Sequence, residues 1–512
     1  MKKRIRNHLA RGQRRIRARL SRRQMSTARE RPVLGSATCH YEPASRTRAI
    51  AAGGIGAMQT VARRSGLISE IDKRVELLKI HAPYHESDHV MNLALNVLCG
   101  GQCLEDIELR RNDEAFLDAL GAVSIPDPTT AGDFCRRFDE ASVDALMTAV
   151  NEARLRVWKQ QPAAFFEEAI IDADGTLVGT TGECKEGMDI DYKGGWGYHP
   201  LMISLANTLE PLFLSNRSGN RPSSEGAAGY LDRAVELVRR AGFRRVRLRG
   251  DTDFSQTEHL DRWDGDEVRF VFGYDAHPNL VAKADLLPNS AWKKLGRDAK
   301  YEVKTEPRAR PENVKERIVK EREFKNIRLN SEDVAEFEYS PSKCKNTYRL
   351  IVLRKNLTIE KGEVALFDDI RYFFYITNDR AASAHEIVYH SNKRCDQEKI
   401  FDELKNEVRS LRAPVDNLIS NWAYMVMVSI AWSLKAWFAL LMPVSPRWQD
   451  RHLTTKSKFL RMSFRTFVNR IILMPAQIVS TGRRLVYKLL SWTPWQADFF
   501  RTIAALTSPL TC

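Results

Sequence analysis

Acidic side chains lie at the ends of two short strand-like runs in the middle of the chain, and their type suits metal binding. The run 169–175 ends with Asp172 and Asp174, and the run 245–250 is followed by Asp251 and Asp253. Carboxylate oxygens are the ligands that hard divalent cations prefer. Two Mg²⁺ ions about 3.5–4 Å apart can activate an attacking water or hydroxyl and stabilise the leaving oxygen of a phosphodiester.

One acid of each pair is better placed to be a ligand. Asp172 and Asp174 share one side of a strand because side chains alternate with a period of two. Asp174 lies nearer the strand end and is preferred, with Asp172 kept as the alternative. Asp251 directly ends the second strand and is preferred to Asp253. The competing interpretation is that these aspartates serve only as turn and cap residues.

A third acid lies on a helix that also carries cations. A rotation of about 100° per residue places Arg394, Glu398 and Lys405 within about 40° of one another, with Glu403 on the opposite side. Such a stripe could hold one metal ligand between two phosphate-binding cations. An ordinary solvated, salt-bridged helix face is the alternative. The two strand ends and this helix together predict an acidic cluster at one edge of a sheet.

The order of apolar runs predicts the elements that position these acids. Strands, a helix and a further strand are expected in the order βββαβ, at residues 169–176, 200–206, 211–215, 227–240 and 245–250. Strand-like alternation then recurs in a charged segment, at residues 301–304, 335–339 and 348–353. This predicts a mostly β insertion, after which the strand 371–377 returns to the core.

The region before these strands has the pattern of helices. Apolar residues recur at intervals of three and four in 90–98 and 143–150, and Thr129 or Thr130 is a candidate cap for a helix between them. His81, His85 and His89 are spaced by four residues. Because Pro83 interrupts any continuous helix there, a metal site formed by these histidines is not expected.

Length and charge limit the class of protein. A chain of 512 residues exceeds a single compact core and predicts two to four domains. The net charge of +15 suits a polyanionic partner. Residues 1–31 hold 13 Lys and Arg against one acid, so a basic arm carries most of this excess. The arm is expected either to follow phosphates or to be an upstream leader preceding a true start at Met25.

Other features favour a reducing compartment and a protein that does not cross a membrane. The eight cysteines show no paired C-x-x-C motif, and no signal peptide follows the basic start. The longest uncharged apolar run is 418–434, interrupted at Lys435. We expect it to form a buried helix rather than a membrane span.

The combination resembles the DDE transposases of bacterial insertion sequences, in the branch with a Tyr, Arg, Glu, Lys signature. The resemblance covers about residues 50–440, and Tyr389 precedes Arg394 by five residues where the usual pattern has three. Its matching segments are 127–130, 136–138, 171–176, 197–201, 248–254, 376–378 and 389–405.

The resemblance implies an α/β fold with an RNase H-like core, a mostly β insertion, an all-helical N-terminal domain and a helical C-terminal tail. It assigns Asp174, Asp251 and Glu398 to catalysis and metal binding, and Arg394, Lys405 and Tyr389 to DNA. The expected segments are a basic arm (1–46), a helical DNA-binding domain (47–165), the first part of the core (166–288), the insertion (289–369), the second part of the core (370–442) and a helical basic tail (443–512).

Such enzymes bind double-stranded DNA at terminal inverted repeats, cleave it and join the 3′ ends to target DNA. The implied cofactor is Mg²⁺, with Mn²⁺ as an alternative, and a homodimer is expected in the synaptic complex. The expected location is the bacterial cytoplasm, at the nucleoid when DNA is bound. A metal-dependent nuclease without strand transfer and a non-catalytic DNA-binding derivative are the alternatives.

Overall fold

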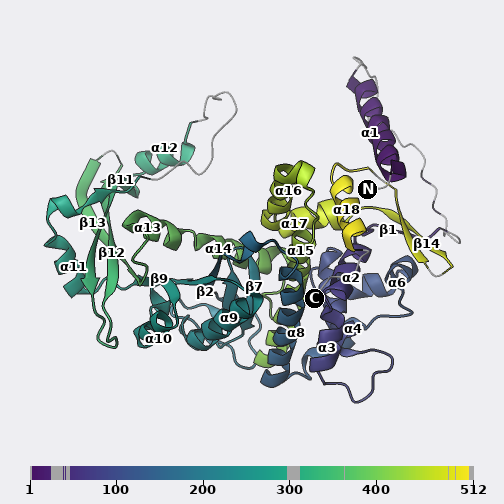
Figure 1. Cartoon of the computed structure of the whole chain (residues 1–512), viewed down its shortest axis with the longest axis horizontal. Coiled ribbons are helices and arrows are strands. Elements are labelled where there is room, and N and C mark those ends of the chain that lie inside the picture. Colours follow the sequence, from purple (N-terminus) through teal and green to yellow (C-terminus); the bar gives the residue numbers. More distant parts are fainter. Residues whose placement is uncertain are drawn as a thin grey trace.

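A computed structural model describes residues 3–24, 39, 41, 47–296, 312–362, 364–482, 484–490 and 492–506. It is a mixed α/β structure in which one large sheet is continued at one end by long strands and flanked at the other by helices (Figure 1). The expected strand at 301–304 falls outside the described residues.

Five strands form the part of the sheet that carries the predicted acids. In the order β7-β6-β2-β8-β9, the strands β7, β2, β8 and β9 run in the same direction, and β6 is antiparallel to its neighbours β2 and β7. The helix α9 packs against this sheet between β7 and β8 in the chain, which confirms the predicted order βββαβ. The bounds are β2 (Glu168–Gly175), β6 (Leu201–Leu205), β7 (Glu210–Ser215), α9 (Ala227–Ala241), β8 (Arg245–Gly250) and β9 (Val268–Tyr274).

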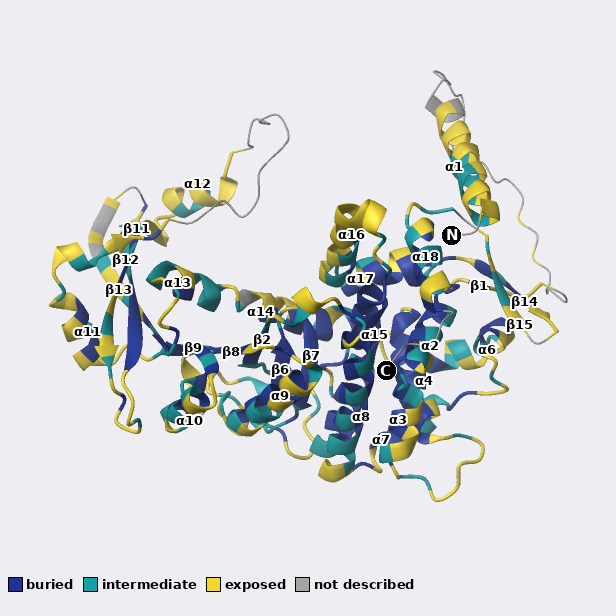
Figure 2. Ribbon diagram, viewed as in Figure 1, coloured by how far each residue is buried: buried dark blue, intermediate teal, exposed yellow. Residues whose placement is uncertain are grey.

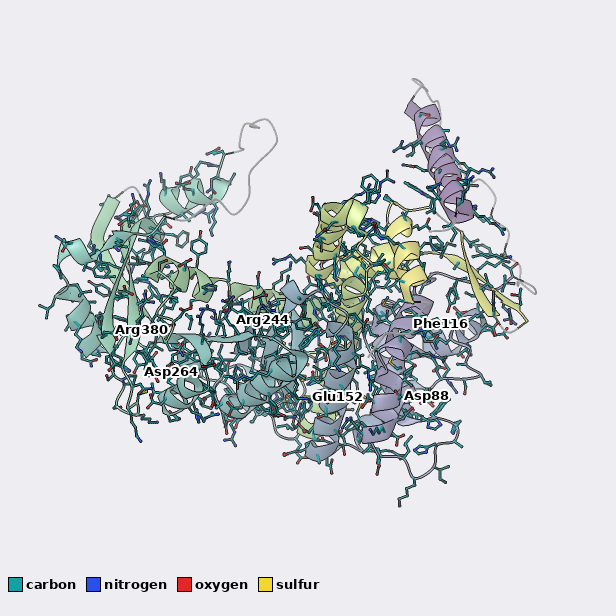
Figure 3. All side chains as sticks on the ribbon, in the orientation of Figure 1. Asp88, Phe116, Glu152, Arg244, Asp264 and Arg380 are labelled. Carbon is teal, nitrogen blue, oxygen red and sulfur yellow. The ribbon has the colours of Figure 1, made fainter. Side chains whose placement is uncertain are left out.

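The β insertion continues the same sheet. β13 pairs with β9 through Phe374–Thr377 and with β12 along its length, giving the order β10-β11-β12-β13-β9. Asp264 and Arg380, labelled in Figure 3, lie at this junction: Asp264 accepts a 2.8 Å hydrogen bond from Asn378, and Arg380 pairs with Glu338. The elements are α10 (Leu260–Gly265), α11 (Pro278–Asp285), β10 (Lys293–Lys294), α12 (Val314–Glu321), β11 (Lys325–Tyr339), β12 (Tyr348–Lys361) and β13 (Val364–Thr377).

Helices form the N-terminal region, as predicted. The cap of α7 is Asp127 rather than a threonine, because its carboxylate accepts the backbone N–H of Thr130 and leaves Pro128 at the first helical position. The start of the basic arm is the exposed helix α1 (Figure 2). The helices are α1 (Lys3–Gln24), α2 (Ile55–Arg64), α3 (Leu67–Arg74), α4 (Glu86–Leu98), α5 (Ile107–Arg111), α6 (Glu114–Leu120), α7 (Pro128–Cys135) and α8 (Glu140–Trp158).

The central helix α15 (Leu418–Leu440) joins the sheet to the N-terminal helices. It is long and apolar enough to cross a membrane. As predicted, however, 94% of its most apolar stretch of 18 residues is buried inside the protein (Figure 2). The buried Glu210 on β7 fixes its position by accepting hydrogen bonds from Arg154, Trp158 and Trp437, at 3.0, 3.0 and 2.8 Å. One buried carboxylate thus ties β7 to both α8 and α15.

The C-terminal tail is only partly helical. β14 and β15 form a hairpin that pairs with β1, so the expectation of an all-helical N-terminal domain is wrong at β1, and the tail that was expected to be helical also contains two strands. Gly482 turns the hairpin with a φ of 57°, a conformation that glycine adopts readily. The elements are β1 (Ala49–Ile50), α16 (Gln449–Arg461), α17 (Phe464–Phe467), β14 (Ala476–Thr481), β15 (Arg484–Leu489) and α18 (Gln496–Leu506).

Candidate active site

Two of the predicted acids lie together at the ends of adjacent parallel strands. Asp172 on β2 is in register with Arg249 on β8, so Asp174 and Asp251 leave the sheet at the same edge. Arg394 lies between them, because its Nη1 is 2.8 Å from Asp174 Oδ2 and 3.9 Å from Asp251 Oδ2. The guanidinium brings the helix that follows into contact with both strand ends.

Asp172 has a different environment from Asp174. Both of its carboxylate oxygens accept hydrogen bonds from Arg249, at 2.6 and 2.7 Å, and both side chains are buried. Arg249 also donates a 2.9 Å hydrogen bond to the carbonyl of His390 on α13 (Ala384–Asn392). Asp172 is therefore engaged in holding β2, β8 and α13 together, and the geometry favours Asp174 as the acid that faces the cluster.

The third acid lies on the helix that packs against β2 and β6. Glu398 is exposed on α14 (Cys395–Asp402), one turn after Arg394. Its neighbour Gln397 is fully buried and donates hydrogen bonds to the carbonyls of Met202 and Asp172, at 3.1 and 3.4 Å. This amide holds α14 against β2 and β6 and so fixes the part of the helix from which Glu398 projects.

Burial, together with the charge of neighbouring acids, raises the pKa of two of these aspartates. Burial raises the pKa of Asp174 from 3.8 to about 6; the charge of Arg394 opposes this rise, whereas Asp251 and Glu398 add to it. Burial also raises the pKa of Asp251, and Asp253 contributes to that rise. The Asp251 carboxylate also caps the short turn that follows it, because its Oδ1 accepts the backbone N–H of Asp253 at 3.1 Å. Excess negative charge partly withdrawn from water fits a site for a hard divalent cation.

The sequence matches the family model described as Transposase DDE domain group 1 over residues 47–510. The chain is a DDE transposase. Members of this family act on DNA and generally use a divalent metal. No curated protein matches the sequence. Among solved structures, the chain is similar to the piggyBac transposase in a synaptic complex with hairpin DNA, with 12% identity, a TM-score of 0.33 and coverage of 83% of this chain and 86% of that chain.

The predicted cations of the transposase do not share one α-helical stripe. The helix changes to a π-helical turn at Glu403–Glu407, and such turns are frequent at functional sites. Because this turn is wider than an α-helical one, Lys405 does not lie on the helix face that the α-helical period predicts for it. Lys405 Nζ nevertheless reaches the strand end beside Asp174, where it donates a 2.5 Å hydrogen bond to Thr176 Oγ1. Glu403 faces away as predicted, because it is buried and accepts the backbone N–H of Phe464 at 2.8 Å.

Tyr389 lies half-buried on α13, the helix before the one that carries Arg394 and Glu398. Its assignment to DNA remains a prediction. The wider spacing between Tyr389 and Arg394 coincides with the break between α13 and α14.

One side chain beside the acids was not assigned a role from the sequence. His199 lies within the 197–201 segment that carries part of the resemblance, and its ring packs against Gly175, the residue after Asp174. Burial and then the charge of Arg217 lower the pKa of His199. The segment pointed to this position, but only the fold places β5 (Trp196–Tyr198) and β6 beside the end of β2.

Of the three histidines spaced by four residues, His89 lies apart from the other two. His89 stacks on Phe134 with a ring distance of 4.3 Å, whereas His81 and His85 stack on each other at 4.8 Å beside Glu86. The planes of the latter two rings differ by only 11°, so the lone pairs of their nitrogens lie in separate, nearly parallel planes. One nitrogen of each ring and a carboxylate oxygen of Glu86 nevertheless lie within 4.8 Å of one another, and His81 Nε2 is 3.2 Å from Glu86 Oε2.

Proposed function

We propose that this transposase binds the terminal inverted repeats of a bacterial insertion sequence, cleaves the DNA by metal-dependent hydrolysis and joins the freed 3′ ends to target DNA. The observation that carries the proposal is the convergence of Asp174 and Asp251 around Arg394 at the ends of two adjacent parallel strands. The order β7-β6-β2-β8-β9, with α9 between β7 and β8, supports an RNase H-like core.

Asp174, Asp251 and Glu398 would hold the Mg²⁺ ions, with Mn²⁺ as a substitute. Bound there, the metal would supply an activated oxygen nucleophile and stabilise the charge on the leaving oxygen. Arg394 pairs with Asp174 and partly offsets the repulsion between the two aspartates. Lys405, held at the end of β2 by Thr176, is suited to a phosphate near the cleaved bond, and Tyr389 is proposed to contact the same DNA.

Other parts of the chain would bind the remaining DNA. The N-terminal helices are proposed to recognise the terminal repeats, and the basic helix α1, which carries no acid, is suited to phosphates. A homodimer would synapse the two ends, and the protein would act at the nucleoid in the cytoplasm.

The test is cleavage of a plasmid that carries the inverted repeats flanking the gene. Asp174→Ala, Asp251→Ala and Glu398→Ala should each abolish Mg²⁺-dependent cleavage while leaving end binding nearly intact. Asp275→Ala is the matched control, because this exposed acid contributes charge near Asp251 without being a proposed ligand. Normal cleavage by any one of the three variants would remove that residue from the site.

Precleaved ends supplied with a target plasmid distinguish the transposase from a simple nuclease. Joined products would support strand transfer. Cutting without joining would favour the nuclease, and binding without either reaction would favour a non-catalytic derivative.

A further inference from the structure

His199 lies at the edge of the acid cluster. A methyl group built on Gly175 would be 2.7 Å from His199 Cε1 and 3.3 Å from Nδ1, so the imidazole rests directly on the backbone that follows Asp174. The side chain is half-buried, and Lys405 and Asp253 are both close enough to act on its charge. The ring therefore packs on the end of β2 and lies within electrostatic range of Lys405 and Asp253.

Arg217 fixes both the position and the tautomer of this histidine. The backbone N–H of His199 donates to the Arg217 carbonyl at 2.8 Å, and Arg217 Nε donates back to the His199 carbonyl at 3.0 Å. Arg217 Nη2 lies 3.5 Å from His199 Nδ1. Because a guanidinium can only donate, this approach favours Nδ1 as the acceptor and Nε2 as the protonated nitrogen of the ring.

The guanidinium itself has little freedom to move. Arg217 Nη1 donates to the carbonyls of Pro222, Ser223 and Glu225, at 3.1, 3.1 and 2.7 Å. It is thus an internal support for His199 rather than a cation directed at DNA. Nε2–H has no hydrogen-bond partner within the part of the chain that the structure describes.

We propose that His199 contacts the DNA directly, with its Nε2–H donating a hydrogen bond to a non-bridging oxygen of the phosphate that is cleaved or of its immediate neighbour. This inference rests on the proposed function. With Lys405 on the same side of Asp174, His199 would hold the phosphodiester in register with the acids.

The test measures single-turnover cleavage of the flanking-repeat plasmid by the full-length protein at saturating DNA. We expect His199→Ala to slow cleavage about 10- to 100-fold, the range for one hydrogen bond to a charged group, with DNA affinity little changed. His199→Gln, which keeps an N–H donor, should recover part of the rate. His277→Ala is the control, because it removes an exposed imidazole at the start of α11 that is not assigned to the site.

Sulfur substitution of the non-bridging oxygens separates contact from a merely structural role. One phosphorothioate stereoisomer should slow the wild-type protein and have little further effect on His199→Ala. Independent effects of the sulfur and the substitution, or equal rates for the wild type and His199→Ala, would overturn the inference. Failure of the wild-type protein to cleave would instead contradict the proposed function.

Discussion

Asp174→Asn should stabilise the metal-free protein while abolishing cleavage. The pKa of Asp174 rises from 3.8 to about 6 in the folded state, so the folded protein binds more protons than the unfolded chain between these values. The free energy of unfolding therefore falls as pH increases through this window. The full shift corresponds to a destabilisation of about 3 kcal/mol above pH 7.

The dependence on pH provides the quantitative test. Integrating the shift gives a destabilisation of about 1.5 kcal/mol at pH 5 and about 3 kcal/mol at pH 8. Asparagine does not titrate, so this destabilisation is absent from Asp174→Asn. In urea unfolding with a chelator present, the free energy of unfolding of the variant should therefore gain about 1.5 kcal/mol over that of the wild type between pH 5 and pH 8. Asp275→Asn serves as the exposed control.

Mg²⁺ should reverse the stability difference between Asp174→Asn and the wild type. Ions bound by the native acids would stabilise the wild-type protein by about 2.7 kcal/mol at a hundred times the dissociation constant, and the variant much less. The reasoning is refuted if the difference between Asp174→Asn and the wild type does not change with pH, or if Mg²⁺ stabilises both proteins equally.

Three further substitutions test other parts of the structure. Asp172→Ala should lower the free energy of unfolding by about 3–5 kcal/mol in urea titrations, because Arg249 would remain buried without its carboxylate partner. Burial lowers the pKa of Lys435 to about 7. The cost of burying its charged ammonium therefore destabilises the fold fully below pH 7 and fades as pH rises towards 10.5. Lys435→Met should raise the free energy of unfolding at pH 6.5 by about 2–4 kcal/mol. Gly175→Ala should displace His199 and slow single-turnover cleavage about 10- to 100-fold, and an unchanged rate would show that the ring position does not matter.

The local sequence carried enough information to predict the strands that bear the acids. β2 is a short apolar run that ends in acids, and β8 alternates Arg with Val and Leu directly before Asp251. The preference for Asp174 over Asp172 agrees with the geometry, but the sequence could not show why. The burial of Asp172 depends on Arg249, which lies 77 positions further along the chain.

Non-local pairing accounts for most of what the sequence did not reveal. β9 was not anticipated, although it is the strand that joins the core to the insertion. The hairpin β14–β15 lies in the tail that was expected to be helical, and its pairing with β1 joins residues more than 400 positions apart in the chain. The π-helical turn at Lys405 likewise departs from the ideal helical period on which the stripe was based.

The uninterrupted sheet from β10 to β7 means that the insertion cannot be treated as a detachable module. Removing β10, β11 and β12 would leave β13 as the outermost strand, with a row of backbone amides and carbonyls open to solvent. Such an edge is a template for pairing between molecules. A shortened chain would thus aggregate even with every acid of the cluster intact, so engineered versions of this protein should keep the long strands and change only the side chains on their surfaces.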